Sequence, residues 1–205
     1  MQMQLMYIRT KVERNQDVYS ELLRKSIHMA VALVPAAAYF NITLTMSMLA
    51  LGILFYTWTE EMRLAGYRVP VVTAVTHRAG RGKDAEGMVL GPITLAIGAM
   101  LALMLYPDPV STIAIYALAF GDGFASLVGR VWGRIPLSFN SNKTVEGSFA
   151  CLAAVFLVTF AYFDNPMAAV LVAVTAMLIE SMSLGDMDNV VMPFGVGLVA
   201  GMIII

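Results

Sequence analysis

The sequence predicts an all-α integral membrane protein that crosses the bilayer about seven times. Of its 205 residues 59% are hydrophobic and only 13% are charged, and the mean hydropathy is +0.76. Long apolar runs alternate with short polar connections. This composition excludes an intrinsically disordered chain, a disulfide scaffold and a soluble nucleic-acid-binding domain, so we expect no nucleic-acid partner. The single cysteine, Cys151, lies in an apolar run and is expected to be a small core residue.

Residues 1–25 predict an amphipathic helix that lies on the membrane surface. Leu5, Ile8 and Val12 recur at helical spacing, and charged residues fill the positions between them. This interfacial helix leads into a transmembrane bundle over residues 26–205. We therefore expect a single membrane-embedded domain over 1–205.

Seven apolar runs follow, and each one predicts a helix. Several are shorter than the roughly 20 residues that a perpendicular span needs, so flanking residues or a thinned bilayer must complete them. Short polar connections such as Pro107-Asp108-Pro109 and Asp164-Asn165-Pro166 separate neighbouring runs. The runs cover residues 26–41, 42–59, 88–106, 110–131, 148–163, 166–183 and 190–205.

The distribution of basic residues predicts the orientation. All thirteen Lys and Arg residues precede the first run, lie between the second and third, or lie between the fourth and fifth. In a seven-span arrangement these segments share one side, which the positive-inside rule makes the cytoplasm. The amino end is then cytoplasmic and the carboxyl end outside. The long loops 60–87 and 131–147 also face the cytoplasm, where we expect the active site.

Asp122 is an acid inside an apolar run. An ionised carboxylate at such a position costs at least ~2.5–3.5 kcal/mol on insertion scales unless a cation or water offsets it. Helical spacing places Asp122, Ser126 and Arg130 on one face, so Asp122 is expected either to pair with Arg130 or to bind a ligand. A neighbouring face carries small residues, which close helix packing alone would explain. These are Gly121, Ala125, Gly129 and Gly133.

The segment Ser141–Ser148 predicts an anion site before the fifth run. Ser141 or Asn142 can cap that helix, which places Lys143 in its first turn. Free backbone N–H groups, the Thr144 hydroxyl and the Lys143 ammonium favour a phosphate, and Glu146 suggests a metal ion beside it. The alternative is that Lys143 only reaches the lipid headgroups.

A third polar cluster joins the last two runs. Asp186, Asp188 and Asn189 are oxygen ligands of the kind that Mg²⁺ takes, although Asp188 or Asn189 can equally cap the last helix. The glycine and glutamate spacing of an EF-hand is missing, which excludes a calcium sensor. Further polar residues lie at the same predicted level, where each is an anchor or ion-pair partner and together they can line one site. These are Arg24, Lys25, His28, Glu60, Arg63 and Glu86.

The motif Gly121-Asp122-Gly123-x-Ala125-Ser126-x-x-Gly129-Arg130-x-x-Gly133, followed by Asn142-Lys143-Thr144-x-Glu146-Gly147, resembles the signature of the CTP-dependent lipid-alcohol kinases. This family includes dolichol kinase, phytol kinase and CTP-dependent diacylglycerol kinase. The resemblance extends to Arg24-Lys25-x-x-His28 and Asp188-Asn189-x-x-x-Pro193, and so covers most of the chain. Val191 departs from the pattern, because the family commonly has threonine there. The K-T-x-E-G form is more similar to dolichol kinases than to phytol kinases.

The resemblance implies a membrane-embedded kinase domain that uses CTP and Mg²⁺. It would transfer the γ-phosphate to the hydroxyl of a membrane isoprenoid alcohol or another lipid alcohol, giving a polyprenyl monophosphate and CDP. A homo-oligomer is compatible with it. The implied catalytic residues are Asp122, Lys143 and Glu146, and the implied magnesium ligands are Asp122, Glu146 and Asp188. The implied nucleotide-binding residues are Gly121, Gly123, Ser126, Arg130, Asn142, Lys143, Thr144 and Gly147. Supporting residues would be Arg24, Lys25, His28, Glu60, Arg63, Glu86 and Asn189.

Two other activities fit part of the pattern. A phosphatidate cytidylyltransferase also uses CTP and magnesium and has a similar Asp…Gly…K-T-x-E-G stretch, but its carboxyl-terminal D-R-x-D signature is missing here. A transporter can use acids within spans, such as Asp122 and Glu180. No inverted repeat is visible, however, and the polar residues gather toward one side.

Overall fold

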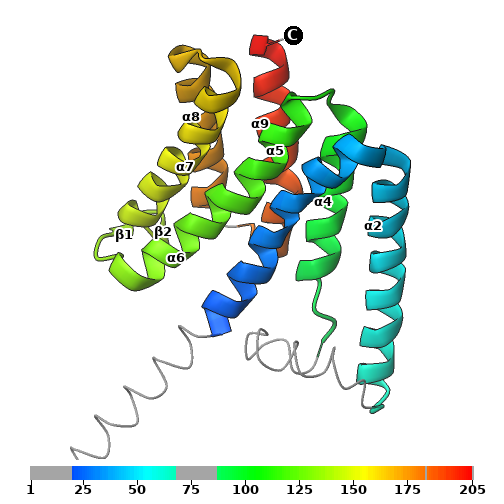
Figure 1. Cartoon of the computed structure of the whole chain (residues 1–205). Helices are drawn as coiled ribbons and strands as arrows, with labels where there is room; N and C mark the ends of the chain where they lie inside the picture. Colours follow the sequence, from blue (N-terminus) through cyan, green and yellow to red (C-terminus); the bar gives the residue numbers. More distant parts are fainter. Residues whose placement is uncertain (1–19, 68–86, 183, 205) are drawn as a thin grey trace, which may run out of the picture.

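Helices that run side by side form almost the whole structure (Figure 1). The computed structural model describes residues 20–67, 87–182 and 184–204. It confirms the predicted helical fold and adds one small two-stranded hairpin. In chain order the elements are η1 (Ala30–Leu33), α2 (Val34–Leu64), α4 (Gly91–Leu105), α5 (Val110–Tyr116), η3 (Ala117–Asp122), α6 (Gly123–Trp132), β1 (Pro136–Leu137), β2 (Asn140–Thr144), α7 (Val145–Phe163), α8 (Pro166–Met182), η4 (Gly185–Met187) and α9 (Asp188–Ile204).

The first described segment is a helical hairpin, Ser20–Leu64, which we call the N-terminal hairpin. Asn41 has an extended backbone (φ −159°, ψ 101°) within α2, and the chain turns back there (Figure 1). The Asn41 side chain accepts a hydrogen bond from the Leu44 backbone N–H at 2.9 Å and so begins the returning helix. This turn coincides with the expected break between the runs 26–41 and 42–59. Most of the expected interfacial helix over 1–25 lies outside the described residues.

Length and composition make four helical segments candidate membrane helices. They are Ser20–Leu64, Val110–Trp132, Val145–Phe163 and Gly185–Ile203, while α4 and α8 are apolar but shorter. Large apolar side chains cover the outside of the bundle; Leu54, Phe55 and Trp58 of α2 are all more than half exposed. Such an extensive apolar exterior, around an interior that contains buried charges, is typical of a protein that resides in a membrane.

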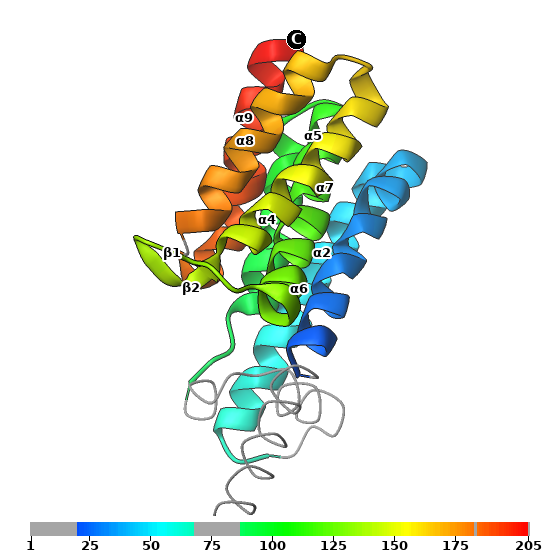
Figure 2. The ribbon, with the colours of Figure 1, turned by 90° about the vertical axis from the view of Figure 1, so that its left-hand side faces the viewer.

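A single rod, Val110–Trp132, runs through the middle of the bundle and consists of α5, η3 and α6 in succession. We call it the central rod. Figure 2 shows the N-terminal hairpin on one side of it and α8 and α9 on the other. Ile113 and Ala117 of the rod share a fully buried core with Val155, Val172 and Met192 from α7, α8 and α9. The η3 segment is π-helical. Its wider turns shift the register of the side chains that precede it relative to those that follow.

The segment before α7 differs from the prediction. The expected cap at Ser141 or Asn142 is wrong, and so is the expected place of Lys143 in the first helical turn. Residues 140–144 form strand β2, which pairs with β1, and α7 begins only at Val145. Thr144 is the capping residue, since its hydroxyl accepts a hydrogen bond from the Gly147 N–H at 3.2 Å. Ser141, Asn142 and Thr144 are all residue types that can cap a helix. Because strand β2 continues to Thr144, Thr144 is the one that caps α7.

Candidate functional site

Asp122 is buried at the end of the π-helical segment and pairs with two residues of the N-terminal hairpin. Its Oδ2 atom accepts a hydrogen bond from Lys25 Nζ and lies 3.3 Å from His28 Nε2. The same His28 nitrogen lies 3.0 Å from the backbone carbonyl oxygen of Leu118. The alternative of a pair between Asp122 and Arg130 is wrong, because Arg130 instead lies 3.4 Å from Glu21. Asp122 and Arg130 are eight residues apart, about 12 Å along the rod, so each side chain reaches a different turn of the N-terminal hairpin.

Close packing brings the hairpin to the rod at this point. A Cβ atom on Gly123 would lie 2.8 Å from Cγ of Met29, one residue beyond His28. A side chain larger than that of glycine would therefore require Met29 to shift, next to the turn that carries Lys25 and His28. Gly123 acts here as a packing residue.

Lys143 makes a second ion pair, partly buried, with the buried Glu180 of α8. Its Nζ atom lies 2.6 Å from Glu180 Oε1, and the Ser148 hydroxyl donates to Glu180 Oε2 at 3.1 Å. Burial by itself would lower the pKa of Lys143, but the negative charges of Glu180 and Asp122 outweigh it and raise that pKa above its ordinary value. Lys143 is therefore a cation at neutral pH.

Glu180 is not among the residues that the sequence predicts for this site. It was a candidate only for the transporter alternative. The available signal was that Glu180 is the one charged residue in the apolar run 166–183. Such an acid needs a partner. That the partner is Lys143 depends on the packing of α7 against α8, which spacing along the chain does not reveal.

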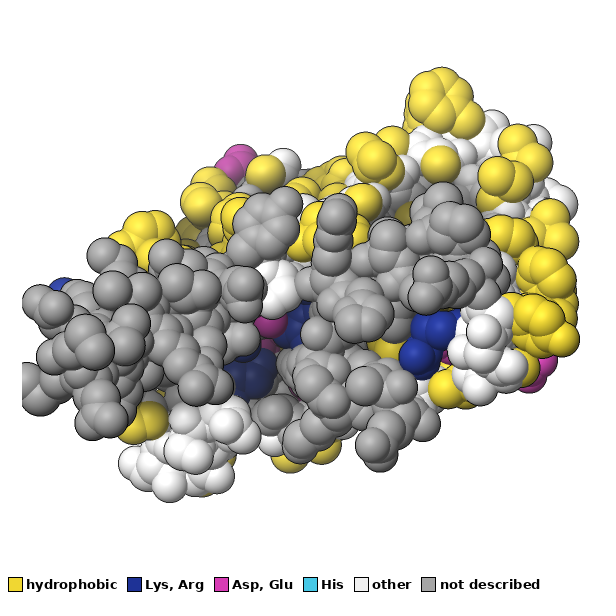
Figure 3. All heavy atoms as spheres, turned by 90° about the horizontal axis from the view of Figure 1, so that it is seen from below, with side chains coloured by type: hydrophobic (Ala, Val, Ile, Leu, Met, Phe, Trp, Pro, Cys, Tyr) yellow, Lys and Arg dark blue, Asp and Glu magenta, His cyan; other side chains and the backbone are white. Residues whose placement is uncertain are grey.

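The two ion pairs belong to one group, which we call the charge cluster: Lys25, His28, Asp122, Lys143, Ser148 and Glu180. Lys143, from the second pair, also feels the negative charge of Asp122, from the first pair. The two pairs are therefore coupled electrostatically, and the charge of Asp188 acts on Lys143 as well. Two lysines balance two carboxylates within it. Figure 3 views the bundle from below the orientation of Figure 1, where basic and acidic side chains show in two places and hydrophobic side chains lie along the flank.

The structure places Glu146 away from Asp122. Its carboxylate accepts hydrogen bonds from the backbone N–H groups of Arg134, at 3.0 Å, and Ile135, at 3.3 Å. Glu146 thus joins the start of α7 to the segment that follows α6. Asn142 is exposed and its N–H donates to the Asn140 side chain at 3.3 Å, whereas Ser126 is half-buried on the rod.

The small residues of the motif pack α6 against α7. A Cβ atom on Gly147 would lie 2.7 Å from the carbonyl oxygen of Ala125, and one on Gly121 would lie 2.9 Å from Val155. Gly129 faces both Thr144 and Gly147. The packing explanation of this stripe is confirmed, and its assignment to nucleotide binding stays a prediction.

The remaining candidates tie helix ends together. Glu60 is fully buried, lies 2.8 Å from Arg63 and accepts a hydrogen bond from the Val89 N–H at 3.0 Å. The Asn189 amide donates to the Thr94 hydroxyl at 2.9 Å and thereby joins α9 to α4. Asp188 accepts a hydrogen bond from the Leu184 N–H at 2.7 Å. Arg24 pairs with Glu21 at 2.6 Å, and Glu86 lies outside the described residues.

The carboxylates suit a metal ion that a substrate also binds. Within residues 20–67, 87–182 and 184–204, no three His, Cys, Asp or Glu side chains gather closely enough to hold a metal by themselves. Mg²⁺ in phosphoryl-transfer sites is usually held by one or two carboxylates together with phosphate oxygens and water. Asp122, Glu180 and Asp188 are the candidates for such a site, because the charges of all three act on the Lys143 ammonium group.

Comparison with known proteins gives homologues of one kind. A phytol kinase of Synechocystis sp. is 28% identical over 192 residues, which cover 88% of this chain and 78% of that protein. A farnesol kinase of Arabidopsis thaliana is 31% identical over 104 residues, or 50% of this chain and 34% of its own. A probable phytol kinase of Triticum aestivum is 29% identical over 148 residues, and the match covers 48% of it. The chain thus spans about half or less of these two plant relatives.

No protein-family model matches this chain, and no solved structure does. These homologues support the resemblance to lipid-alcohol kinases, because the chain is similar at modest identity to phytol kinases and to a farnesol kinase.

Proposed function

We propose that this chain is a kinase that transfers the γ-phosphate of CTP to the hydroxyl of a membrane isoprenoid alcohol. The observation that carries the proposal is the charge cluster, in which Lys25–Asp122 and Lys143–Glu180 lie buried or partly buried in a membrane protein related to phytol and farnesol kinases. Phosphoryl transfer depends chiefly on positioning and on neutralising charge, for which buried lysines and carboxylates are suitable groups.

The pairing suggests how the site receives a nucleotide. Each lysine has a carboxylate partner, so both charges are compensated before substrate arrives. The ammonium groups of Lys143 and Lys25 would turn from these carboxylates to the phosphates. Asp122, with Glu180 and Asp188, would then hold Mg²⁺, which neutralises phosphate charge when bound. Glu146, in this proposal, positions the segment that carries Lys143 through its bonds to residues 134 and 135.

We also propose that the described helices make seven membrane passes with the charge cluster on the cytoplasmic side. The two arms of the N-terminal hairpin, α4, the central rod, α7, α8 and α9 would be the passes. The distribution of all thirteen basic residues supports this orientation. Cysteines introduced at Ser141 and Asp164, both exposed, test it. An impermeant thiol reagent should label Ser141→Cys only from the cytoplasm and Asp164→Cys only from outside, and labelling of both from one side would refute it.

Radiolabelled CTP tests the chemistry. Purified protein in lipid nanodiscs would receive γ-labelled or α-labelled CTP with Mg²⁺ and a panel of farnesol, geranylgeraniol, phytol, dolichol and diacylglycerol. We expect the γ-label in a lipid product of an isoprenoid alcohol. Transfer of the α-label would show a cytidylyltransferase, and equal use of ATP would refute the choice of donor. Loss of transfer in Lys143→Ala, with Gly52→Ala as an active control on the outer face of α2, ties the activity to the charge cluster.

A further inference from the structure

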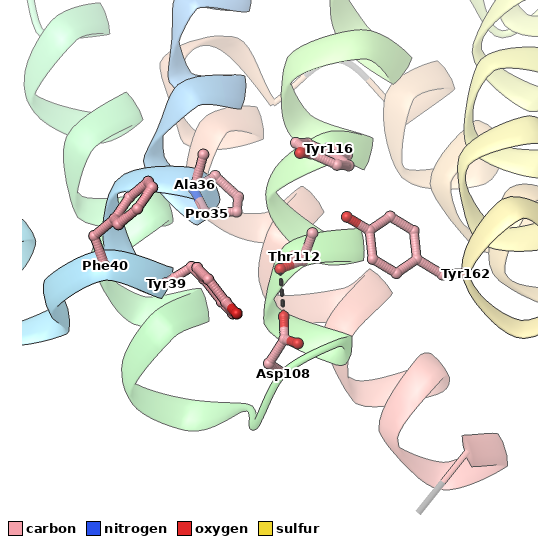
Figure 4. Close-up of a pocket in the computed structure, with 8 residues that line it drawn as sticks. All are labelled: Pro35, Ala36, Tyr39, Phe40, Asp108, Thr112, Tyr116 and Tyr162. Carbon is pink, nitrogen blue, oxygen red and sulfur yellow. Dashed lines mark hydrogen bonds between the residues drawn. The ribbon is translucent and has the colours of Figure 1, made fainter.

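A cavity of about 340 Å³ opens beside the central rod, toward the end that is remote from Asp122. Ala36 and Tyr39 of the N-terminal hairpin line it on one side, and Thr112 and Tyr116 of α5 with Tyr162 of α7 line it on the other. Figure 4 shows the rings of Tyr39 and Tyr162 on opposite sides of Thr112. Its volume is at the lower end of the roughly 300–1,000 Å³ typical of small-ligand sites.

A row of aromatic rings leads from this cavity toward the charge cluster. The ring centroids of Tyr162 and Tyr116 are 6.2 Å apart, those of Tyr116 and Phe120 are 5.4 Å apart, and those of Phe120 and Phe124 are 6.3 Å apart. The last three side chains recur every four residues and therefore share one face of the rod. Phe124 is two residues beyond Asp122 and is 41% exposed, whereas Asp122 is buried. The row therefore ends at the same height along the rod as the carboxylate, on a different side of the helix.

The length of this path matches a short isoprenoid. Thr112 and Asp122 are ten residues apart on one helical rod, which corresponds to about 15 Å. Three backbone bonds of an extended peptide span about 3.3–3.6 Å, so the four chain bonds of one isoprene unit span about 4.5–5 Å. About three units therefore fit between the charge cluster and the cavity.

From this continuity we infer that the aromatic row and the cavity bind the tail of the isoprenoid alcohol, with its hydroxyl at the Phe124 end of the row, level with Asp122, and its third unit in the cavity. The inference rests on the proposed function, and it assigns to Ala36, Tyr39 and Tyr116 the selection of chain length. Aromatic rings offer a large apolar surface to a methyl-branched chain. Two polar side chains that line the cavity already bond to each other, because the Thr112 hydroxyl donates a hydrogen bond to the Asp108 carboxylate at 2.6 Å.

Two adjacent alanines give a matched test. Ala36 lines the cavity and Ala37 does not, although both are exposed on the same helix. Ala36→Trp should lower the ratio of kcat/KM for farnesol, with three units, to that for geraniol, with two, by about tenfold or more, the discrimination typical of apolar pockets. Ala37→Trp should leave that ratio unchanged. An unchanged ratio in Ala36→Trp, or equal changes in the two variants, would overturn the inference.

Crosslinking tests the tail site without turnover. A farnesol analogue with a diazirine at the end remote from the hydroxyl would be irradiated with the wild-type protein in nanodiscs, and the labelled peptides identified by mass spectrometry. Label on residues 35–40, 108–116 or 162, competed by farnesol and reduced in Ala36→Trp, supports the inference. Label elsewhere overturns it. Wild-type protein that is labelled there but transfers no phosphate from CTP would refute the proposed function and leave the tail site supported.

Discussion

The central rod and the N-terminal hairpin contribute to the same charge cluster but are packed very differently. In its most apolar stretch the rod has 61% of its residues buried, whereas the hairpin has 6%. Asp122 belongs to the rod, which shares its core with α7, α8 and α9, while Lys25 and His28 come from an element that exposes most of its surface. Half of the site is therefore fixed by the core, and half depends on one face of an outer helix pair.

The difference teaches which substitutions should affect folding and which should affect only chemistry. A change inside the rod or at its packed neighbours alters a close-packed interior and has to destabilise the fold. A change on the exposed face of the hairpin leaves the core intact. The predictions below use this contrast.

The largest expected effect is on turnover, from Asp122→Asn. If the carboxylate acts on the phosphates and their metal, phosphoryl transfer should fall by about 10²–10³, in the range found when one electrostatic group of an active site is removed. The variant also leaves Lys25 buried without its anionic partner, which destabilises the protein. The double variant Lys25→Gln with Asp122→Asn should regain thermal stability in detergent but no activity. A stable, active double variant would show that Asp122 only balances Lys25.

A large effect on folding is expected from Gly98→Ala. A Cβ atom there would lie 1.9 Å from the Asn189 carbonyl oxygen, so α4 and α9 have to separate. We expect the free energy of unfolding to fall by about 1–3 kcal/mol, as for other overpacked interiors. Reversible unfolding in mixed micelles measures it, and an unchanged value would mean that the two helices are not held so closely.

An intermediate effect is expected on pH dependence from Glu180→Gln. The raised pKa of Lys143 means that its charge is fully present below the ordinary lysine pKa and is lost only as the pH rises through the raised value. Without Glu180 the burial of Lys143 is opposed only by the charges of Asp122 and Asp188, so the pKa of Lys143 should fall relative to that in the unchanged protein. The alkaline loss of kcat/KM should therefore begin at lower pH in the variant. A profile that keeps its alkaline limb, with lower rates at every pH, would assign Glu180 a role independent of Lys143.

The smallest effect is expected from Gly52→Ala, the counterpart of Gly98→Ala on the outer hairpin. No atom outside the local backbone lies within 4 Å of the added Cβ. Alanine is favoured over glycine within a helix by about 0.5–1 kcal/mol, so this variant should be slightly more stable. Turnover should not change. A loss comparable to that of Gly98→Ala would show that the exposed face of α2 is covered by another element.

Features that follow from the unfavourable free energy of placing one polar or charged residue in an apolar run could be predicted from the sequence. Asp122 was identified because an acid in an apolar run needs compensation, and the break near Asn41 because polar residues interrupt two apolar runs. Partners could not be predicted, since Lys25 and Asp122, or Lys143 and Glu180, meet only through helix packing. The π-helical segment could not be predicted either. It has no local sequence signal here. Asp122 pairs with Lys25 and His28 of the N-terminal hairpin and Arg130 pairs with Glu21, which the spacing within the rod does not reveal.

The distance along the chain between Lys25 and Asp122 also sets an order of events during biosynthesis. The two residues are 97 positions apart, and a ribosome adds about 5–20 residues per second. Lys25 therefore waits about 5–20 seconds for the carboxylate that will neutralise it. During that interval its long side chain can keep the ammonium group among lipid headgroups. The nascent hairpin thus carries a charge that holds it at the membrane surface until the central rod arrives, and the closing of this pair marks the moment when the site is complete.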